Sequence, residues 1–177
     1  MPRYAAFLAS VNVGGNRVSM ADLKTALEGC GLERVETVVA SGNVLFDHDR
    51  ASDAALETLI GDCVRERFGF RTFAAVRGVA ELKAALAENP FVGGNEDKFV
   101  YVHFLARPLT GAMFGKLAQA HAGPEKLAAG TRDLYMDYVE GAGRSKLTAA
   151  FIEKHLGCMG TARNIRSINR IVEKMEQ

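Results

Sequence analysis

The chain has 177 residues, of which 48% are hydrophobic and 24% charged, and its formal net charge is +1. This much apolar material is enough for a sizeable core, so the composition excludes a globally disordered chain. The small net charge excludes a protein that is basic throughout, and no run reaches the roughly 18 apolar residues that a membrane span needs.

The first half predicts the order strand, helix, strand, strand, helix, strand. Apolar runs and turn residues indicate the strands, and apolar positions at steps of three and four indicate the helices. Ser19 is expected to cap the first helix and Ser52 the second. The predicted elements are a strand Tyr4–Val11, a helix from Met20, strands Val35–Ala40 and Val44–Phe46, a helix Ser52–Phe68 and a strand Phe70–Val76.

After a connecting helix Val79–Glu88 and a boundary at Gly93-Gly94-Asn95, this order partly recurs. We therefore predict an α+β fold of two ferredoxin-like (βαββαβ-type) halves with antiparallel sheets, residues 1–92 and 93–177, plus a C-terminal helix. The elements predicted in the second half are a strand Lys98–Leu105, a helix Thr110–His121, strands Lys126–Ala129 and Asp133–Val139, and helices Leu147–Leu156 and Ala162–Met175.

Positive charge gathers in the C-terminal third, where residues 141–177 hold 7 Lys and Arg against 3 Asp and Glu. In the last predicted helix an apolar stripe and a basic stripe lie on opposite faces. Thr161 is expected to cap this helix, with Arg163 and Asn164 in its first turn, where a bound anion would offset the unfavourable helix dipole. The alternative is a solvated helix face. The basic stripe consists of Arg163, Arg166, Arg170 and Lys174.

Three loops contain residue types that bind anions. The clearest runs from Gly141 to Thr148, where glycines precede Arg144, Ser145 and Lys146 and could let backbone N–H groups converge on a phosphate. An ordinary flexible connection explains this loop equally well. The other two loops are also explained by turn chemistry alone. Their candidate ligand-binding residues are Asn12, Gly14, Gly15 and Arg17 in the first, and Ser41 and Asn43 in the second.

The cysteines and histidines give no catalytic or metal-binding pattern. Cys30, Cys63 and Cys158 are odd in number and form no CxxC pair, and Cys63 falls on a predicted apolar stripe. We therefore expect no disulfide framework, a reducing compartment and a cytoplasmic location. The four histidines lack ligand spacing, so no metal or cofactor is predicted. The face of Asp133, Tyr135 and Asp137 is expected to be an exposed polar sheet face.

Four ordered segments resemble the bacterial domain-of-unknown-function 1697 family: VNVGGNRVSMADL, SGNVLF, SKLTAAFIEKHLG and TARNIRSINRIVEKM. The resemblance covers essentially the whole chain and implies an α+β protein with two ferredoxin-like halves. It implies no established activity. The family usually has an Arg-Gly-Ile string where this chain has Ala9-Ser10-Val11, and a Trp where this chain has Ile165.

The sequence leaves three hypotheses for function. The first is a binder of a phosphorylated ligand or nucleic acid that uses the basic C-terminal third. The second is an enzyme acting on a small anionic metabolite, with Ser145, Lys146, Asn12 and Asp137 as the residues to consider. The third is a protein–protein adaptor. The catalytic residues, if any, and the oligomeric state stay open.

Overall fold

The computed structural model describes residues 1–12, 14–39, 42–49 and 53–177. These residues form two compact units. The N-terminal unit comprises Met1–Glu81 together with Arg170–Gln177, and the C-terminal unit comprises Leu82–Asn169. Each unit contains one four-stranded sheet, and all strand pairs are antiparallel.

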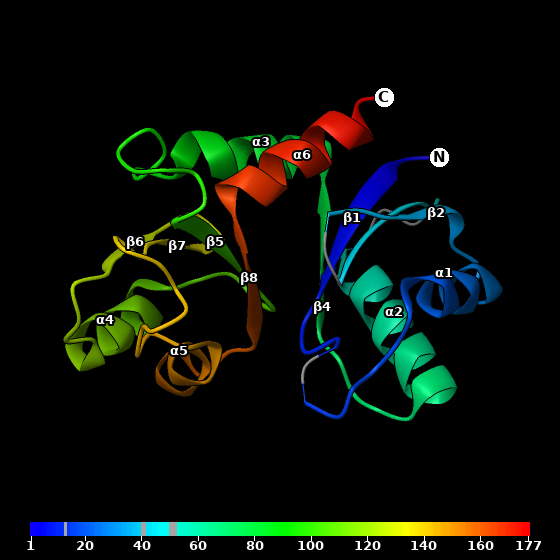
Figure 1. Ribbon diagram of the computed structural model, residues 1–177, viewed down its shortest axis with the longest axis horizontal. Helices are drawn as coiled ribbons and strands as arrows, with labels where there is room; N and C mark the ends of the chain where they lie inside the picture. Colours follow the sequence, from blue (N-terminus) through cyan, green and yellow to red (C-terminus); the bar gives the residue numbers. More distant parts are fainter. Residues whose placement is uncertain (13, 40–41, 50–52) are drawn as a thin grey trace. The chain divides into compact units, whose positions relative to one another are not determined.

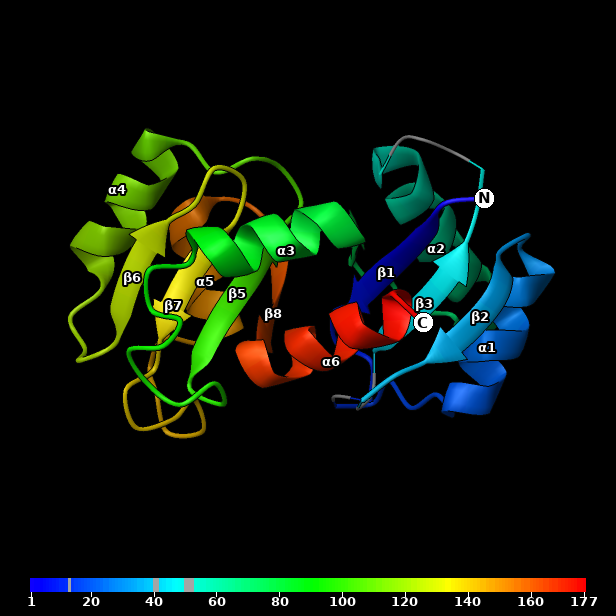
Figure 2. The same cartoon turned by 90° about the horizontal axis from the view of Figure 1, so that it is seen from above.

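In the N-terminal unit the strand order is β2-β3-β1-β4, as expected for a ferredoxin-like half, and Figure 2 shows β2, β3 and β1 side by side. The central strand β1 pairs with β3 on one side, where Ala5 lies opposite Leu45, and with β4 on the other, where Ala6 lies opposite Val76. The elements are β1 (Arg3–Leu8), α1 (Met20–Gly29), β2 (Glu33–Thr37), β3 (Asn43–Asp47), α2 (Asp53–Phe68) and β4 (Ala74–Gly78).

Both helices of this unit cover one face of its sheet (Figures 1 and 2). Leu23 and Leu27 of α1 and Leu56 and Ile60 of α2 belong to one buried cluster with alternate residues of β1, such as Ala6. Such a cluster gives each amphipathic helix most of its stability, because the buried stripe and not intrinsic propensity holds it in place.

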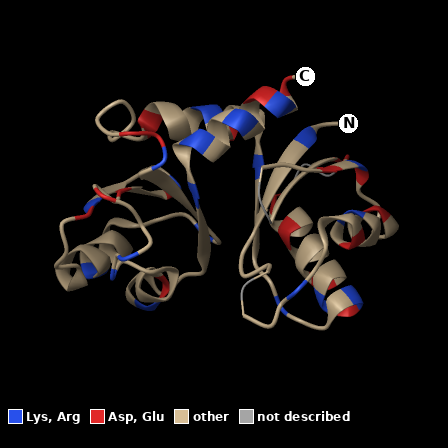
Figure 3. Cartoon of the chain, in the orientation of Figure 1, with Lys and Arg blue, Asp and Glu red and all other residues tan. Residues whose placement is uncertain are grey.

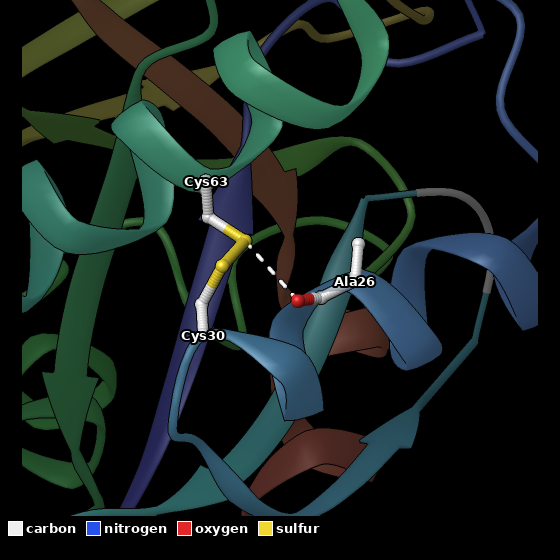
Figure 4. The surroundings of a disulfide bond; sticks show 3 residues. All are labelled: Ala26, Cys30 and Cys63. Carbon is white, nitrogen blue, oxygen red and sulfur yellow. Dashed lines mark hydrogen bonds between the residues drawn. A yellow bond between two sulfur atoms is a disulfide. The ribbon is translucent and has the colours of Figure 1, made fainter.

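The N-terminal helices are joined by a disulfide between Cys30 and Cys63 (Figure 4). Cys30 is the C-cap of α1, and Cys63 is a buried residue of α2 whose Sγ lies 3.2 Å from the carbonyl oxygen of Ala26. The expectation that the chain has no disulfide was therefore wrong, although Cys63 does lie on the buried stripe. Cys158 is a free, buried thiol.

The C-terminal unit repeats the same arrangement with strand order β6-β7-β5-β8. Its helices α4 and α5 bury Leu117, Ile152 and Leu156 against Leu105 and Met136 of the sheet. Two ferredoxin-like halves are thus confirmed. The elements are β5 (Val100–Leu105), α4 (Gly111–Ala120), β6 (Lys126–Ala129), β7 (Leu134–Asp137), α5 (Ala149–Leu156) and β8 (Gly160–Asn164).

Two further helices are α3 (Val79–Glu88), which has the predicted bounds, and α6 (Ile165–Met175). The last predicted helix began too early, because residues 160–164 form β8 at the edge of the C-terminal sheet. There Thr161 pairs with Phe104 and Arg163 with Val102, so β5 gains its second neighbour. Lys and Arg recur along α6 (Figure 3).

Candidate functional site

A pocket of about 950 Å³ lies in the C-terminal unit, and we call it the loop pocket. Two loops form most of its wall. One follows α4 and runs from His121 to Glu125, and the other follows β7 and runs from Tyr138 to Lys146. Phe151, in the first turn of α5, adds an aromatic side chain. This volume is within the range of small-molecule sites, so the pocket is large enough for a metabolite.

The glycine loop predicted from the sequence is part of this wall. Gly141 has φ of +123°, a conformation that side chains disfavour, so glycine is needed for the turn that leaves β7. The N–H of Ser145 donates to the carbonyl of Ala142, and the Tyr138 hydroxyl donates to the carbonyl of Leu147. These bonds fix both ends of the loop and place Arg144, Ser145 and Lys146 at the pocket.

Both cations of this loop are available to a ligand. Arg144 and Lys146 are exposed, and neither forms an ion pair with any residue that the structure describes. Among those residues the backbone N–H groups of Gly143, Arg144 and Lys146 also have no protein acceptor. Positive side chains beside open N–H groups attract an anion.

Behind the loop, Glu125 ties the two walls of the pocket together. Its carboxylate oxygen Oε1 accepts a short hydrogen bond from the Ser145 hydroxyl, which in turn accepts from the N–H of Leu147. The bond from Ser145 lowers the pKa of Glu125, although burial of the carboxyl acts in the opposite direction. The carboxyl is therefore ionised at neutral pH.

The loop before β6 encloses this carboxylate. His121 Nε2 lies 2.9 Å from the carbonyl oxygen of Glu125 and 3.6 Å from its Oε2. Because a carbonyl only accepts, this ring nitrogen carries the proton. A Cβ on Gly123 would lie 3.1 Å from the Glu125 carboxyl carbon, so a larger residue there would displace the Glu125 side chain. Sequence reasoning missed His121 and Glu125.

The Ser145 hydroxyl is not placed to act as a nucleophile. Its single proton is donated to Glu125, and a carboxylate whose pKa is lowered is a poor base for a serine hydroxyl. The side chain instead holds Glu125 against the glycine loop. The geometry therefore favours binding over nucleophilic catalysis at this residue.

The predicted residues of the Asn12 loop lie in the N-terminal unit and bond mainly to one another. Asn12 Oδ1 accepts from the N–H of Val18, and the N–H of Asn12 donates to the carbonyl of Asn16. Gly14 and Gly15 have open space where a Cβ would stand, and Arg17 is exposed. This network accounts for the loop as a structural turn.

The second N-terminal candidate, the turn before β3, is only partly described. Asn43 is buried as the first residue of β3, and its carbonyl accepts from the N–H of Val38. Ser41 lies outside the described residues, as does the Ser52 cap.

The candidates near the C-terminus do not line the loop pocket. Thr161 does not cap α6, because it lies in β8 and its hydroxyl accepts from the Arg163 guanidinium. That guanidinium also donates to the carbonyl of Ala162, and its burial lowers the pKa of Arg163 to about 10. The cap of α6 is Asn164, whose Oδ1 accepts from the N–H of Ser167. The prediction that Thr161 caps the last helix, with Arg163 in its first turn beside free N–H groups, was therefore wrong.

The remaining two arginines of the basic stripe, Arg166 and Arg170, are exposed residues of α6. The opposite stripe is buried as predicted. It consists of Ile165, Ile168, Val172 and Met175.

Asp133, which precedes β7, and Asp137, its last residue, have structural roles. Asp133 and Asp137 are both buried, so the predicted exposed polar face was wrong. Asp133 accepts from the N–H of Leu105, and Asp137 accepts from the N–H of Val139 and the amide of Asn95. Carboxylates that satisfy backbone donors in this way hold loops and are not free for acid–base chemistry.

The described part of the chain contains neither a cluster of metal-ligating side chains nor a helix that could span a membrane. No group of three or more His, Cys, Asp or Glu side chains is placed to hold a metal ion. No helix there combines the length and apolar character needed to cross a membrane.

Comparisons with known proteins identify a family but no activity. No curated protein matches the chain. The solved structure of the conserved bacterial protein SP0830 from Streptococcus pneumoniae is similar over 100% of this chain and 99% of that one, with 22% identity and a TM-score of 0.74, which shows the fold alone. A family model described as "Protein of unknown function (DUF1697)" matches residues 1–135. Since this match covers well over half of the 177 residues, the chain belongs to the DUF1697 family.

Proposed function

We propose that the protein binds a small phosphorylated molecule in the loop pocket. The observation that carries this proposal is the pair of unpaired cations, Arg144 and Lys146, on a glycine loop. In this loop the N–H groups of Gly143, Arg144 and Lys146 have no acceptor among the described residues. A phosphate has enough oxygen acceptors to take hydrogen bonds from both side chains and from the backbone at once.

The negative charge at the pocket is compatible with such a ligand. Glu125 has a side chain only 7% exposed, and its Oε1 accepts from Ser145, whereas its Oε2 lies 3.6 Å from His121 Nε2 and has no hydrogen-bond partner among the described residues. Glu140 is exposed and so screened by water and salt. Arg144 and Lys146 are exposed and Glu125 is buried, so the two cations are more accessible to a ligand next to residues 143–146 than the Glu125 carboxylate is.

A concave pocket of this volume fits a small molecule better than nucleic acid, whose binding requires a longer charged groove. The first of the three hypotheses named a phosphorylated ligand or nucleic acid, and the pocket favours the phosphorylated small molecule. Binding of a ligand in this pocket is also compatible with a reaction on that ligand. Because the Ser145 hydroxyl is engaged by Glu125, binding is the function with the better physical support.

The test is isothermal titration calorimetry with two probes, adenosine 5′-monophosphate and inorganic pyrophosphate. Arg144→Ala and Lys146→Ala should each weaken binding roughly tenfold, since each removes a charge-assisted hydrogen bond. Lys126→Ala is the matched control, because it removes one exposed positive charge of the same unit that does not line the pocket. If the control weakens binding as much as Lys146→Ala, only net charge is being measured and the proposal fails.

A further inference from the structure

A second, shallow and open depression, of about 490 Å³, is lined by residues of α4 and α5, and we call it the helix groove. Lys116 and Gln119 come from α4, and Lys154 and His155 from α5. Ala120 completes its lining, so no carboxylate lines it. Two lysines and a histidine therefore line one shallow depression, and no acid lines it.

The lysines of the helix groove have no protein partner. Within the part of the chain that the structure describes, neither Lys116 nor Lys154 forms an ion pair. Like charges that share a small space repel each other and raise the local potential. An anion bound between them would relieve the repulsion, and a phosphate would be held by both.

The helix groove adjoins the loop pocket. Ala120 lines both hollows. In addition, the ring of Phe151, which lines the loop pocket, contacts the ring of His155, which lines the groove, with centroids 4.4 Å apart and planes inclined at 51°. An aromatic side chain thus lies between two basic sites, at the place where they meet.

We infer that one ligand occupies both sites, and that it is a nucleoside carrying two separate phosphates. This inference rests on the proposed function, since one phosphate lies at Arg144 and Lys146. The second phosphate lies at Lys116 and Lys154, and the base packs against Phe151. Stacking of a base on an aromatic ring is a general means of binding nucleotides.

The experiment compares adenosine 3′,5′-bisphosphate with adenosine 5′-monophosphate by calorimetry. The wild-type protein should bind the bisphosphate about tenfold more tightly, because it gains the second charge-assisted contact. The groove variant Lys116→Ala/Lys154→Ala should lose this advantage and keep its affinity for the monophosphate. The loop variant Arg144→Ala/Lys146→Ala should weaken both ligands, and Lys126→Ala should weaken neither.

The nucleoside part has its own test. Phe151→Leu keeps an apolar side chain and removes the ring. It should weaken adenosine 5′-monophosphate by about tenfold and leave inorganic pyrophosphate unchanged. Equal losses for the two probes would show that the ring matters only for the shape of the pocket and would overturn the nucleoside assignment.

The outcomes separate the two proposals. If the bisphosphate and the monophosphate bind equally well, and the loop variant weakens both, the second phosphate site is refuted while the proposed function stands. If the loop variant weakens neither ligand, the proposed function fails as well. If a 12-nucleotide oligothymidine binds more tightly than the bisphosphate and the groove variant abolishes that binding, the two hollows belong to a single-stranded nucleic acid site and the small-ligand assignment is overturned.

Discussion

The disulfide between Cys30 and Cys63 gives the sharpest prediction for stability. It closes a loop with a sequence separation of 33 residues between two helices that share one core. The chain-entropy relation for a loop of this length gives about 4 kcal/mol of stabilisation at 25 °C. For a unit of this size that corresponds to a fall in melting temperature of roughly 20 °C when the bond is broken.

The assay is thermal unfolding of the wild-type chain with and without a phosphine reductant, beside Cys30→Ala/Cys63→Ala as a control. The wild type should lose stability on reduction, and the variant should be insensitive to the reductant. Thiol titration in denaturant without reductant should find one free thiol, that of Cys158. Three free thiols, or a melting temperature that the reductant does not change, would refute the reasoning.

Three further predictions concern the C-terminal unit. Both ring nitrogens of His103 are buried without a partner among the described residues, and burial lowers its pKa from 6.5 to about 4. Because the unfolded chain binds the proton more tightly, the free energy of unfolding should fall by about 3 kcal/mol as the pH is lowered from 6.5 to 4. Urea titrations at both pH values measure this fall, and His103→Leu should remove it. Ser145→Ala should lower the free energy of unfolding by about 1–3 kcal/mol, since Glu125 Oε1 loses its donor; an unchanged urea midpoint would contradict this. Gly160→Ala places a Cβ 2.6 Å from His103 Nε2 and should lower the free energy of unfolding by about 1–3 kcal/mol. Its control Gly115→Ala, which has open space around it in α4, should raise the free energy of unfolding by up to about 1 kcal/mol. Equal melting temperatures for the two variants would contradict this prediction.

Much of the fold could be predicted because local patterns and tertiary packing agree. Ser19 caps α1 by accepting from the N–H of Asp22, and Thr110 caps α4 in the same way. The bounds of α3 and β6 matched because apolar spacing and turn residues coincide there. Periodicity is reliable when the buried face of an element follows directly from its sequence.

The strand β8 could not be predicted, because its residues have little intrinsic preference for a strand. Gly160, Ala162 and Asn164 are poor strand formers, and the basic stripe of α6 seemed to extend back through Arg163. What makes the segment a strand is the open edge of β5, to which it bonds. That edge is a tertiary property and has no local signal.

One wall of the loop pocket could be predicted from the sequence, and the other could not. The glycine loop with Arg144 and Lys146 was recognisable from its residue types, and it lines the loop pocket. The opposite wall was missed, because Glu125 contacts a loop 20 residues away along the chain and His121 contacts Glu125. Their signal was the run of turn residues between a helix and a strand, with a histidine and a glutamate at its ends. The disulfide was missed for a similar reason, since no spacing rule relates Cys30 to Cys63.

Binding of a phosphate at the loop pocket is the claim on which this account depends. The most direct measurement is a two-dimensional ¹H–¹⁵N NMR titration of the full chain with adenosine 5′-monophosphate, in which each backbone amide reports its own surroundings. The account predicts that the largest shifts fall on the amides of Gly143, Arg144 and Lys146, with smaller ones at Phe151. Saturating shifts confined to the loop from Asn12 to Arg17, or no shifts at millimolar ligand, would contradict it.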